Sequence, residues 1–269
     1  MDQRELISRI KDRVKSDERL VGLFLAGSFG RDTADEFSDV DLVAVVDPDD
    51  QASFATSWQP LLEEIAHVVF WQRRTINGLL LNAVTTEWLR CDLYIVSRED
   101  VGRRPQSSLR VLLDPRGIFP TLPLRAPAYV SNRVQVQSLF EQFIRVLGLL
   151  PVGVGRKEFH VSVTGAAILR GYLIDLFLEE LEVVDKGGVQ QLNRALTPDQ
   201  MDALERLPCP QPNRESIVEF FLACARIFLS EGACAGGARL DCVSRGICRR
   251  CARTSEATSR LGRVASLVG

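Results

Sequence analysis

The first half of the chain alternates between short apolar runs and polar, turn-forming segments. Apolar residues at helical spacing predict an amphipathic helix over residues 3–16. Two mainly apolar runs, 20–26 and 39–46, predict strands that are buried on at least one face. A helix is predicted over 51–66 with an interruption at Pro60, because proline removes a backbone donor. Three further runs predict strands at 67–71, 76–84 and 88–96. We therefore expect a mixed sheet covered by helices.

The second half has a helical pattern. Five prolines between residues 103 and 130 exclude a long regular element there, so we place the domain boundary after residue 125. Apolar periodicity predicts helices over 132–150, 157–182 and 213–230, the middle one apolar on most sides and central to a bundle. The expected organisation is an α/β (α+β) domain at 1–125, an all-α helical bundle at 126–232, and a disordered Cys- and Arg-rich tail at 233–269.

Composition and charge narrow the function classes. The 269 residues are 46% hydrophobic and 25% charged, which is typical of a folded globular protein. No unbroken apolar run reaches the roughly 18 residues of a membrane span, and the N-terminus lacks a signal-peptide pattern, so we expect a cytoplasmic protein. With 33 basic and 35 acidic residues, nucleic acid is not an expected partner. The seven cysteines are expected to stay thiols, and the oligomeric state is left open, a homodimer included.

Three aspartates are the candidate catalytic and metal-binding residues. Asp39 and Asp41 are two positions apart, so on a strand their carboxylates point to the same face. Like charges at that spacing repel, and Mg²⁺ is a favoured partner for hard carboxylate oxygens. Asp92 lies inside an otherwise apolar strand pattern, where an unpaired charge is costly. Together the three predict a site for one or two divalent ions.

The third carboxylate has competing interpretations. Asp92 could instead form an ion pair with Arg90 or Arg98 at a sheet edge. Asp114 is a rival, because it ends another strand-like run, although its position just before a proline is typical of a turn residue. Asp39 and Asp41 alone would also be compatible with a solvated strand entry.

The turn after the first predicted strand is a candidate phosphate site. Gly27 has no side chain to block a close approach, and Ser28 offers a hydroxyl at the start of a helix whose free N–H groups favour an anion. Arg31 could reach a phosphate or pair with Asp35 four residues later. Alone, the turn could be a simple helix cap. Beside a metal site, it predicts phosphoryl or nucleotidyl transfer.

The segment GSFGR, followed by SDVDL and a lone aspartate on a later strand, resembles the nucleotidyltransferase superfamily typified by DNA polymerase β. The resemblance covers roughly residues 20–96. In layout the chain is most similar to the small antibiotic nucleotidyltransferases of the lincosamide type. The resemblance implies that Asp39 and Asp41 ligate Mg²⁺ and that Ser28 touches the β- or γ-phosphate of ATP. A drug hydroxyl would then attack the α-phosphorus and release pyrophosphate.

Some roles stay open under this resemblance. Asp92 either completes the metal site or accepts the proton of the attacking hydroxyl, and we favour the base role with partial metal contact. Lys157, beside Arg156, is a candidate for the triphosphate and Glu158 for a drug amine or hydroxyl; the alternative is a solvated helix start. The slight acidic excess of the helical half favours a lincosamide over a more highly charged aminoglycoside. A non-catalytic binding module, as in transferase-like antitoxins, is the alternative from another class.

Overall fold

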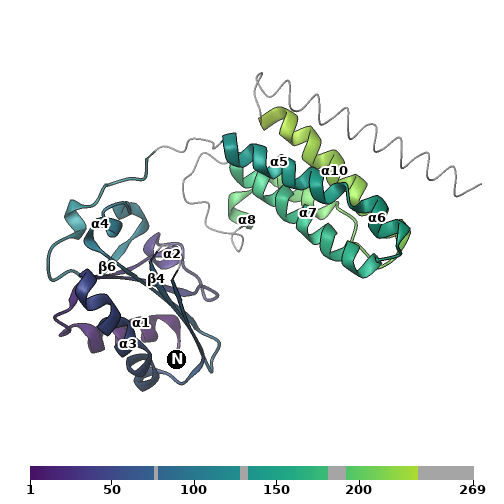
Figure 1. The fold of residues 1–269 in the computed structure, drawn as a ribbon. Coiled ribbons are helices and arrows are strands. Elements are labelled where there is room, and N and C mark those ends of the chain that lie inside the picture. Colours follow the sequence, from purple (N-terminus) through teal and green to yellow (C-terminus); the bar gives the residue numbers. More distant parts are fainter. Residues whose placement is uncertain (76–77, 128–132, 181–191, 236–269) are drawn as a thin grey trace, which may run out of the picture. The chain divides into compact units, whose positions relative to one another are not determined.

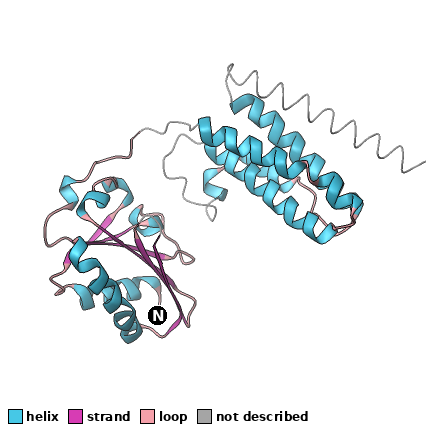
Figure 2. Ribbon diagram, in the orientation of Figure 1, coloured by secondary structure: helices cyan, strands magenta, loops and turns pink. Residues whose placement is uncertain are grey.

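The chain folds into two units with different architectures. The computed structural model describes residues 1–75, 78–127, 133–180 and 192–235. By its internal contacts the chain divides into Met1–Pro127 and Ala128–Gly269. The first unit is a mixed sheet with helices and the second is helical (Figure 1, Figure 2), which confirms the predicted fold class. The predicted boundary after residue 125 lies close to this division, while the roles assigned to the domains stay predictions.

The first unit is built on a six-stranded sheet in the order β3-β4-β5-β2-β1-β6. Strands β2 and β5 are parallel, and the other neighbouring pairs are antiparallel. The strands are β1 (Leu20–Leu25), β2 (Val40–Val46), β3 (Val68–Thr75), β4 (Leu79–Thr85), β5 (Arg90–Val96) and β6 (Arg110–Leu113). The helices are α1 (Gln3–Val14), α2 (Gly27–Gly30), α3 (Pro48–Ile65), α4 (Arg98–Val101) and the 3-10 turns η1 (Gln106–Ser108) and η2 (Phe119–Thr121). The five predicted strands are present, and β6 is the strand-like run that ends before Asp114 in the proline-rich segment.

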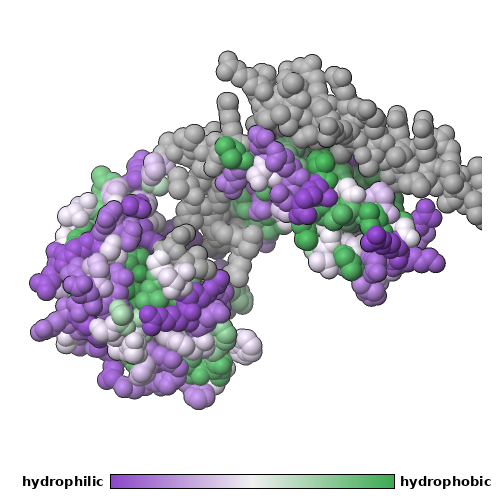
Figure 3. Space-filling view, viewed as in Figure 1, coloured by the Kyte–Doolittle hydropathy of each residue, from purple (hydrophilic) through white to green (hydrophobic). Residues whose placement is uncertain are grey.

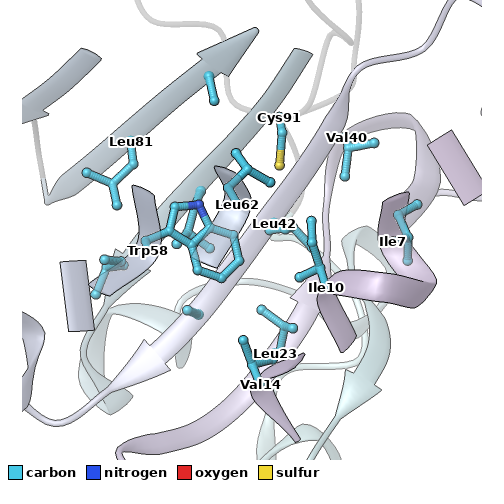
Figure 4. Packing of buried hydrophobic residues seen from close by; sticks show 14 of the residues in the cluster. Ile7, Ile10, Val14, Leu23, Val40, Leu42, Trp58, Leu62, Leu81 and Cys91 are labelled. Atoms are coloured by element: carbon cyan, nitrogen blue, oxygen red, sulfur yellow. The ribbon is translucent and has the colours of Figure 1, made fainter. Parts of the chain in front are cut away.

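The two faces of the sheet bury different sets of side chains, because successive residues of a strand point to opposite faces. On one face, Leu42 and Cys91 pack with Trp58 of α3 and with apolar residues of α1 (Figure 4). The other face has a second apolar cluster, which includes Phe24, Val43, Val45 and Val96. By the same alternation, Asp41 and Asp92 face away from α1 and α3.

Helix α3 runs without a break through Pro60, so the predicted interruption is wrong. Proline cannot donate to the carbonyl of Thr56, four residues earlier. Both residues are exposed, so water can satisfy that carbonyl. Phe54, Trp58 and Leu62, which are buried at four-residue spacing, anchor the helix on both sides of the proline.

The second unit packs its helices around one apolar core. The helices are α5 (Arg133–Leu147), α6 (Leu150–Gly155), α7 (Phe159–Glu179), α8 (Leu192–Ala195), α9 (Pro198–Glu205) and α10 (Arg214–Ala235). Helix α7 contacts α5, α6 and α10, as its apolar character predicts. Phe143 and Phe228 stack with their ring centroids 3.7 Å apart. The predicted first helix, 132–150, corresponds to α5, whereas α6, α8 and α9 were not predicted.

Two segments of this unit, Val134–Gly155 and α7, are long and apolar enough to cross a membrane by length and composition. In α7, Leu169, Leu173 and Phe177 are fully buried in the helical core, as in the central helix of a bundle. Apolar side chains also reach the surface between hydrophilic ones (Figure 3), among them Leu149, Val152, Val161 and Ile168. The expected location in the cytoplasm stays a prediction.

The predicted tail, residues 233–269, overlaps the last helix. Helix α10 continues to Ala235, so residues 233–235 are helical and the predicted start of the tail is wrong. A single glycine, Gly232, is tolerated within a helix at a cost of about 1 kcal/mol, which is too little to end it. Residues 236–269 lie outside the described part of the chain.

Candidate active site

Three polar side chains form a row across β4, β5 and β2. The parallel register of β2 and β5 pairs Asp41 with Asp92, and the antiparallel register of β4 and β5 pairs Asn82 with Asp92. Residues directly opposite each other on neighbouring strands share a face of the sheet. Asn82, Asp92 and Asp41 therefore lie side by side on the face away from α1 and α3. Asp39 immediately precedes β2, at the same end of the sheet.

Arg90 links two of the carboxylates. Its Nη1 lies 3.2 Å from Oδ2 of Asp39, and its Nη2 lies 3.1 Å from Oδ2 of Asp92. Of the two arginines proposed as partners of Asp92, Arg90 is the one in contact, whereas Arg98 pairs with Asp47 at 2.9 Å beyond the far end of β2. The ion pair does not exclude a catalytic role for Asp92, because each carboxylate has a second oxygen.

Two polar atoms of the row are buried without a hydrogen-bond partner. They are Oδ1 of Asp92 and Oδ1 of Asn82, and among the described residues only Nε1 of Trp58 shares this condition. Asp92 is 7% exposed. A buried acceptor without a donor is costly, and such atoms in native proteins call for an explanation such as a bound ion or a catalytic role. Two neighbouring acceptors therefore favour a site that receives a cation or a proton donor.

The turn between β1 and α2 lies directly against Asp41. Ala26 donates its backbone N–H to the carbonyl of Asp41 at 2.9 Å. The next residue, Gly27, has a φ of +54°, and a Cβ added there would lie 2.0 Å from Oδ2 of Asp41. Both the left-handed backbone and the missing space therefore require glycine at this position. The glycine of the GSFGR motif and the second aspartate of SDVDL are adjacent in space.

Helix α2 covers only the four residues of the turn. Ser28 is buried, and its carbonyl accepts the N–H of Thr33 at 2.9 Å. Arg31 follows the last residue of α2, so a pair with Asp35 would not lie within one helix. The positive charge of Arg31 acts on Asp41, where it opposes the rise in pKa. Phosphate contacts by Ser28 and Arg31 stay predictions.

Burial and repulsion raise the pKa of two of the aspartates. For Asp41, burial is the largest cause of the raised pKa, followed by the charges of Asp92 and Asp39, while Arg90 and Arg31 oppose the rise. For Asp39, burial again raises the pKa most; Arg90 lowers it and Asp92 adds to it. The close carboxylates repel one another, as the spacing of the motif predicts.

The carboxylates suit a divalent cation in their chemistry but do not form a finished metal site. Their oxygens are of the type that Mg²⁺ prefers, and Oδ1 of Asp92 lacks a partner. In the part of the chain that the structure describes, no three or more His, Cys, Asp or Glu side chains are grouped to hold a metal ion. Instead, the guanidinium of Arg90 contacts both Asp39 and Asp92. The predicted convergence of three aspartates on one cation is therefore not seen in the side-chain positions, and metal binding stays a prediction.

The raised pKa of Asp41 predicts a pH-dependent penalty on stability. A carboxyl whose pKa is higher in the folded protein stabilises the fold below its unfolded value, near 3.8, and this contribution is lost as the pH rises through the folded value. We expect Asp41→Asn to stabilise the metal-free protein at neutral pH and to lose this advantage as the pH falls towards 3.8. Urea unfolding of both proteins across this range tests the prediction. A difference in the free energy of unfolding that does not change with pH would contradict it.

The two substrate contacts predicted in the second unit lie between α6 and α7. Lys157 has a φ of +58°, and Glu158 immediately precedes α7; both are exposed. The N–H of Lys157 bonds to Val154 and that of Glu158 to Gly153, which is the pattern of a Schellman motif that ends a helix. Lys157 thus belongs to the end of α6 and not to the start of α7, contrary to the sequence prediction. The proposed contacts of both residues stay predictions.

The structure adds one residue to the predicted site and excludes one candidate. Asn82 is an addition, and its signal is the same as that of Asp92, a polar residue within an apolar strand. Asp114, the rival third carboxylate, accepts the backbone N–H groups of Ile118 and Phe119 at 2.9 and 3.0 Å. It therefore organises a turn.

Residues 7–87 match the family model described as nucleotidyltransferase domain. The match includes Gly27, Asp39 and Asp41 and ends before Asp92. It confirms the predicted class of enzyme, a nucleotidyltransferase, and the matched residues lie within the first unit. The comparison with curated proteins found no significant match.

Solved structures of nucleotidyltransferases are similar to the chain at low identity. An aminoglycoside 6-adenyltransferase from Bacillus subtilis is 11% identical with a TM-score of 0.38, covering 92% of this chain and 99% of that one. A nucleotidyltransferase-like protein from Exiguobacterium sibiricum is 12% identical with a TM-score of 0.34, covering 84% and 78%. The Thermotoga maritima CCA-adding enzyme complexed with tRNA is 14% identical with a TM-score of 0.34, covering 97% and 73%. TM-scores of this size do not discriminate between these activities.

Proposed function

We propose that this protein transfers a nucleoside monophosphate, AMP from ATP, to a hydroxyl group of a small antibiotic, a lincosamide, and releases pyrophosphate. The observation that carries the proposal is the pair of Asp41 and Asp92 in register on neighbouring strands, with Gly27 packed against Asp41. The match of residues 7–87, which include Gly27 and Asp41, to a nucleotidyltransferase domain supports the reaction class.

On the nucleotide side, Asp39 and Asp41 would hold Mg²⁺. When bound, Mg²⁺ neutralises charge on the triphosphate and on the departing pyrophosphate. Gly27 keeps the space beside Asp41 clear of any side chain. The first N–H groups of α2 lack acceptors within the helix and would bind a phosphate oxygen together with Ser28 and Arg31.

On the acceptor side, Asp92 is the proposed general base. Its Oδ2 is held by Arg90, whereas its Oδ1 has no partner and is the oxygen able to take a proton. In the transfer step, the acceptor oxygen forms a bond to the α-phosphorus as the bond to the β-phosphate bridge breaks. The hydroxyl proton passes to Asp92, and pyrophosphate leaves.

The second unit is proposed to recognise the drug, with Lys157 near the triphosphate and Glu158 near a drug amine or hydroxyl. A lincosamide carries one amine and a large apolar surface, so it needs fewer carboxylates than a multiply charged aminoglycoside. The slight acidic excess of residues 126–232 suits the less charged drug.

The test is pyrophosphate release by the purified protein in the presence of Mg²⁺. Each of ATP, GTP, CTP and UTP is combined with a panel of lincosamides and aminoglycosides, and the drugs are analysed by mass spectrometry. We expect release with ATP and a lincosamide, together with a mass increase of one AMP on the drug. Modification of aminoglycosides alone would overturn the choice of acceptor. Nucleotide binding without turnover on either class would instead support a non-catalytic binding module.

A further inference from the structure

Arg90 is a positively charged group in direct contact with two carboxylates of the site. One guanidinium spans Asp39 and Asp92, with nitrogen-to-oxygen distances of 3.2 and 3.1 Å. Both contacts use Oδ2 of the aspartate. Arg90 thus offsets the repulsion between carboxylates that would otherwise face each other without compensation.

The two contacts of Arg90 differ in how firmly the fold sets them. Arg90 and Asp92 are two residues apart on β5, so their side chains share a face and the pair is local. The contact with Asp39 instead joins two segments that are distant in the sequence, β5 and the residue before β2. The Asp92 side chain is 10% exposed and that of Asp39 is 29% exposed, while 44% of the Arg90 side chain is open to solvent. The contact with Asp39 is therefore the weaker of the two.

We infer that Arg90 is an internal counter-cation that competes with the divalent ion: it holds Asp39 and Asp92 before the ion binds and releases Asp39 when the ion takes that carboxylate. This inference rests on the proposed function, because it concerns the metal-binding step of the same site. Arg90 is here a positioning residue. When the ion takes Asp39, the contact of Arg90 with Oδ2 of Asp92 remains, and it keeps Oδ1 of Asp92 directed away from the guanidinium.

Competition explains why the carboxylates are close in the sheet and yet form no finished metal site. Asp41 and Asp92 are in register, but Asp39 is held by Arg90. A cation that binds Asp39 is repelled by the positive charge already in contact with Oδ2 of that residue, so Arg90 lowers the affinity for the ion. In return, Arg90 keeps the metal-free row stable. A merely structural ion pair would stabilise the fold without setting metal affinity.

The experiment measures Mn²⁺ binding to the full-length protein without nucleotide or drug, by counting free Mn²⁺ with electron paramagnetic resonance. Arg90→Gln removes the competing charge and is expected to bind Mn²⁺ about fivefold more tightly, since a partly exposed pair of this kind contributes about 1 kcal/mol and about 1.4 kcal/mol corresponds to a factor of ten. Its melting temperature without metal is expected to fall. Arg98→Gln is the matched control, because Arg98 also pairs with an aspartate in this unit but away from the carboxylate row.

Arg90→Lys is the second variant, and it is decisive if Arg90→Gln does not fold. Lysine keeps the charge but cannot span two carboxylates with a planar fork. We therefore expect the Mn²⁺ affinity of Arg90→Lys to lie between that of the wild type and that of Arg90→Gln. If the wild type binds Mn²⁺ saturably and the two Arg90 variants bind it equally or more weakly, the inference about Arg90 is overturned, but the proposed function is not. Absence of saturable Mn²⁺ binding by the wild type would overturn the proposed metal-dependent function as well.

Discussion

Asp41→Asn is expected to reduce nucleotidyl transfer by on the order of 10³-fold, because a metal ion contributes several kcal/mol of charge stabilisation and each 1.36 kcal/mol corresponds to a factor of ten. Asp41 lies at the centre of the site, between Gly27 and Asp92. The amide keeps the volume of the carboxylate but loses the charge that would hold the ion. Pyrophosphate release at saturating ATP, Mg²⁺ and acceptor measures the effect.

Asp47→Asn is the matched control for this variant. Asp47 follows the opposite end of β2, where it pairs with Arg98, and its side chain is about half exposed. Removal of a solvent-exposed ion pair has little effect on stability, because water screens the two charges. We expect nearly unchanged turnover for Asp47→Asn. Equal loss of turnover in both variants would indicate a general effect on the fold and contradict the assignment of Asp41.

Gly27→Ala is expected to have the second largest effect, because it combines strain with a clash. A non-glycine residue at positive φ costs about 1–3 kcal/mol. In addition, the new Cβ would lie 2.0 Å from Oδ2 of Asp41, so the carboxylate must move. A displacement of about 1 Å in a catalytic group can reduce the rate by roughly 10²-fold. Urea unfolding and pyrophosphate release together measure the two parts of the effect.

Gly117→Ala separates these two parts. Gly117 also has a positive φ, +63°, but an added Cβ there meets nothing within 4 Å. We expect a similar loss of stability from backbone strain and no loss of turnover per folded molecule. If Gly117→Ala lost activity as severely as Gly27→Ala, the clash with Asp41 would not be the cause.

The fold was largely predictable because its buried elements have simple periodicities. The apolar runs that contain β1 and β2 have a length typical of strands, and the spacing of Leu6, Ile7, Ile10 and Val14 defines α1. Pro60 shows the limit of such reasoning. A local rule forbids proline within a helix, but the packing of Trp58 and Leu62 on the buried face overrides it.

The candidate site was predictable in its residues more than in its arrangement. Gly27, Asp39 and Asp41 follow from a local motif, and Asp92 from a charge in an apolar strand. The link of Arg90 to Asp39 depends instead on the register of β2 and β5, which are joined by residues 47–89. No local pattern fixes that register. The same holds for Lys157, whose left-handed backbone separates α6 from α7 although its residue type favours a continuous helix.

The central claim is that Asp39 and Asp41 bind a divalent cation beside the Gly27 turn, with Asp92 next to it as the general base. Its most direct test is the anomalous scattering of Mn²⁺ in crystals of the protein grown with Mn²⁺ and a non-hydrolysable ATP analogue. We predict a peak in contact with the carboxylates of Asp39 and Asp41, on the side of Asp92 Oδ1, with the phosphates of the analogue at the turn. A peak bound elsewhere, with all three carboxylates free of the ion, would contradict the account.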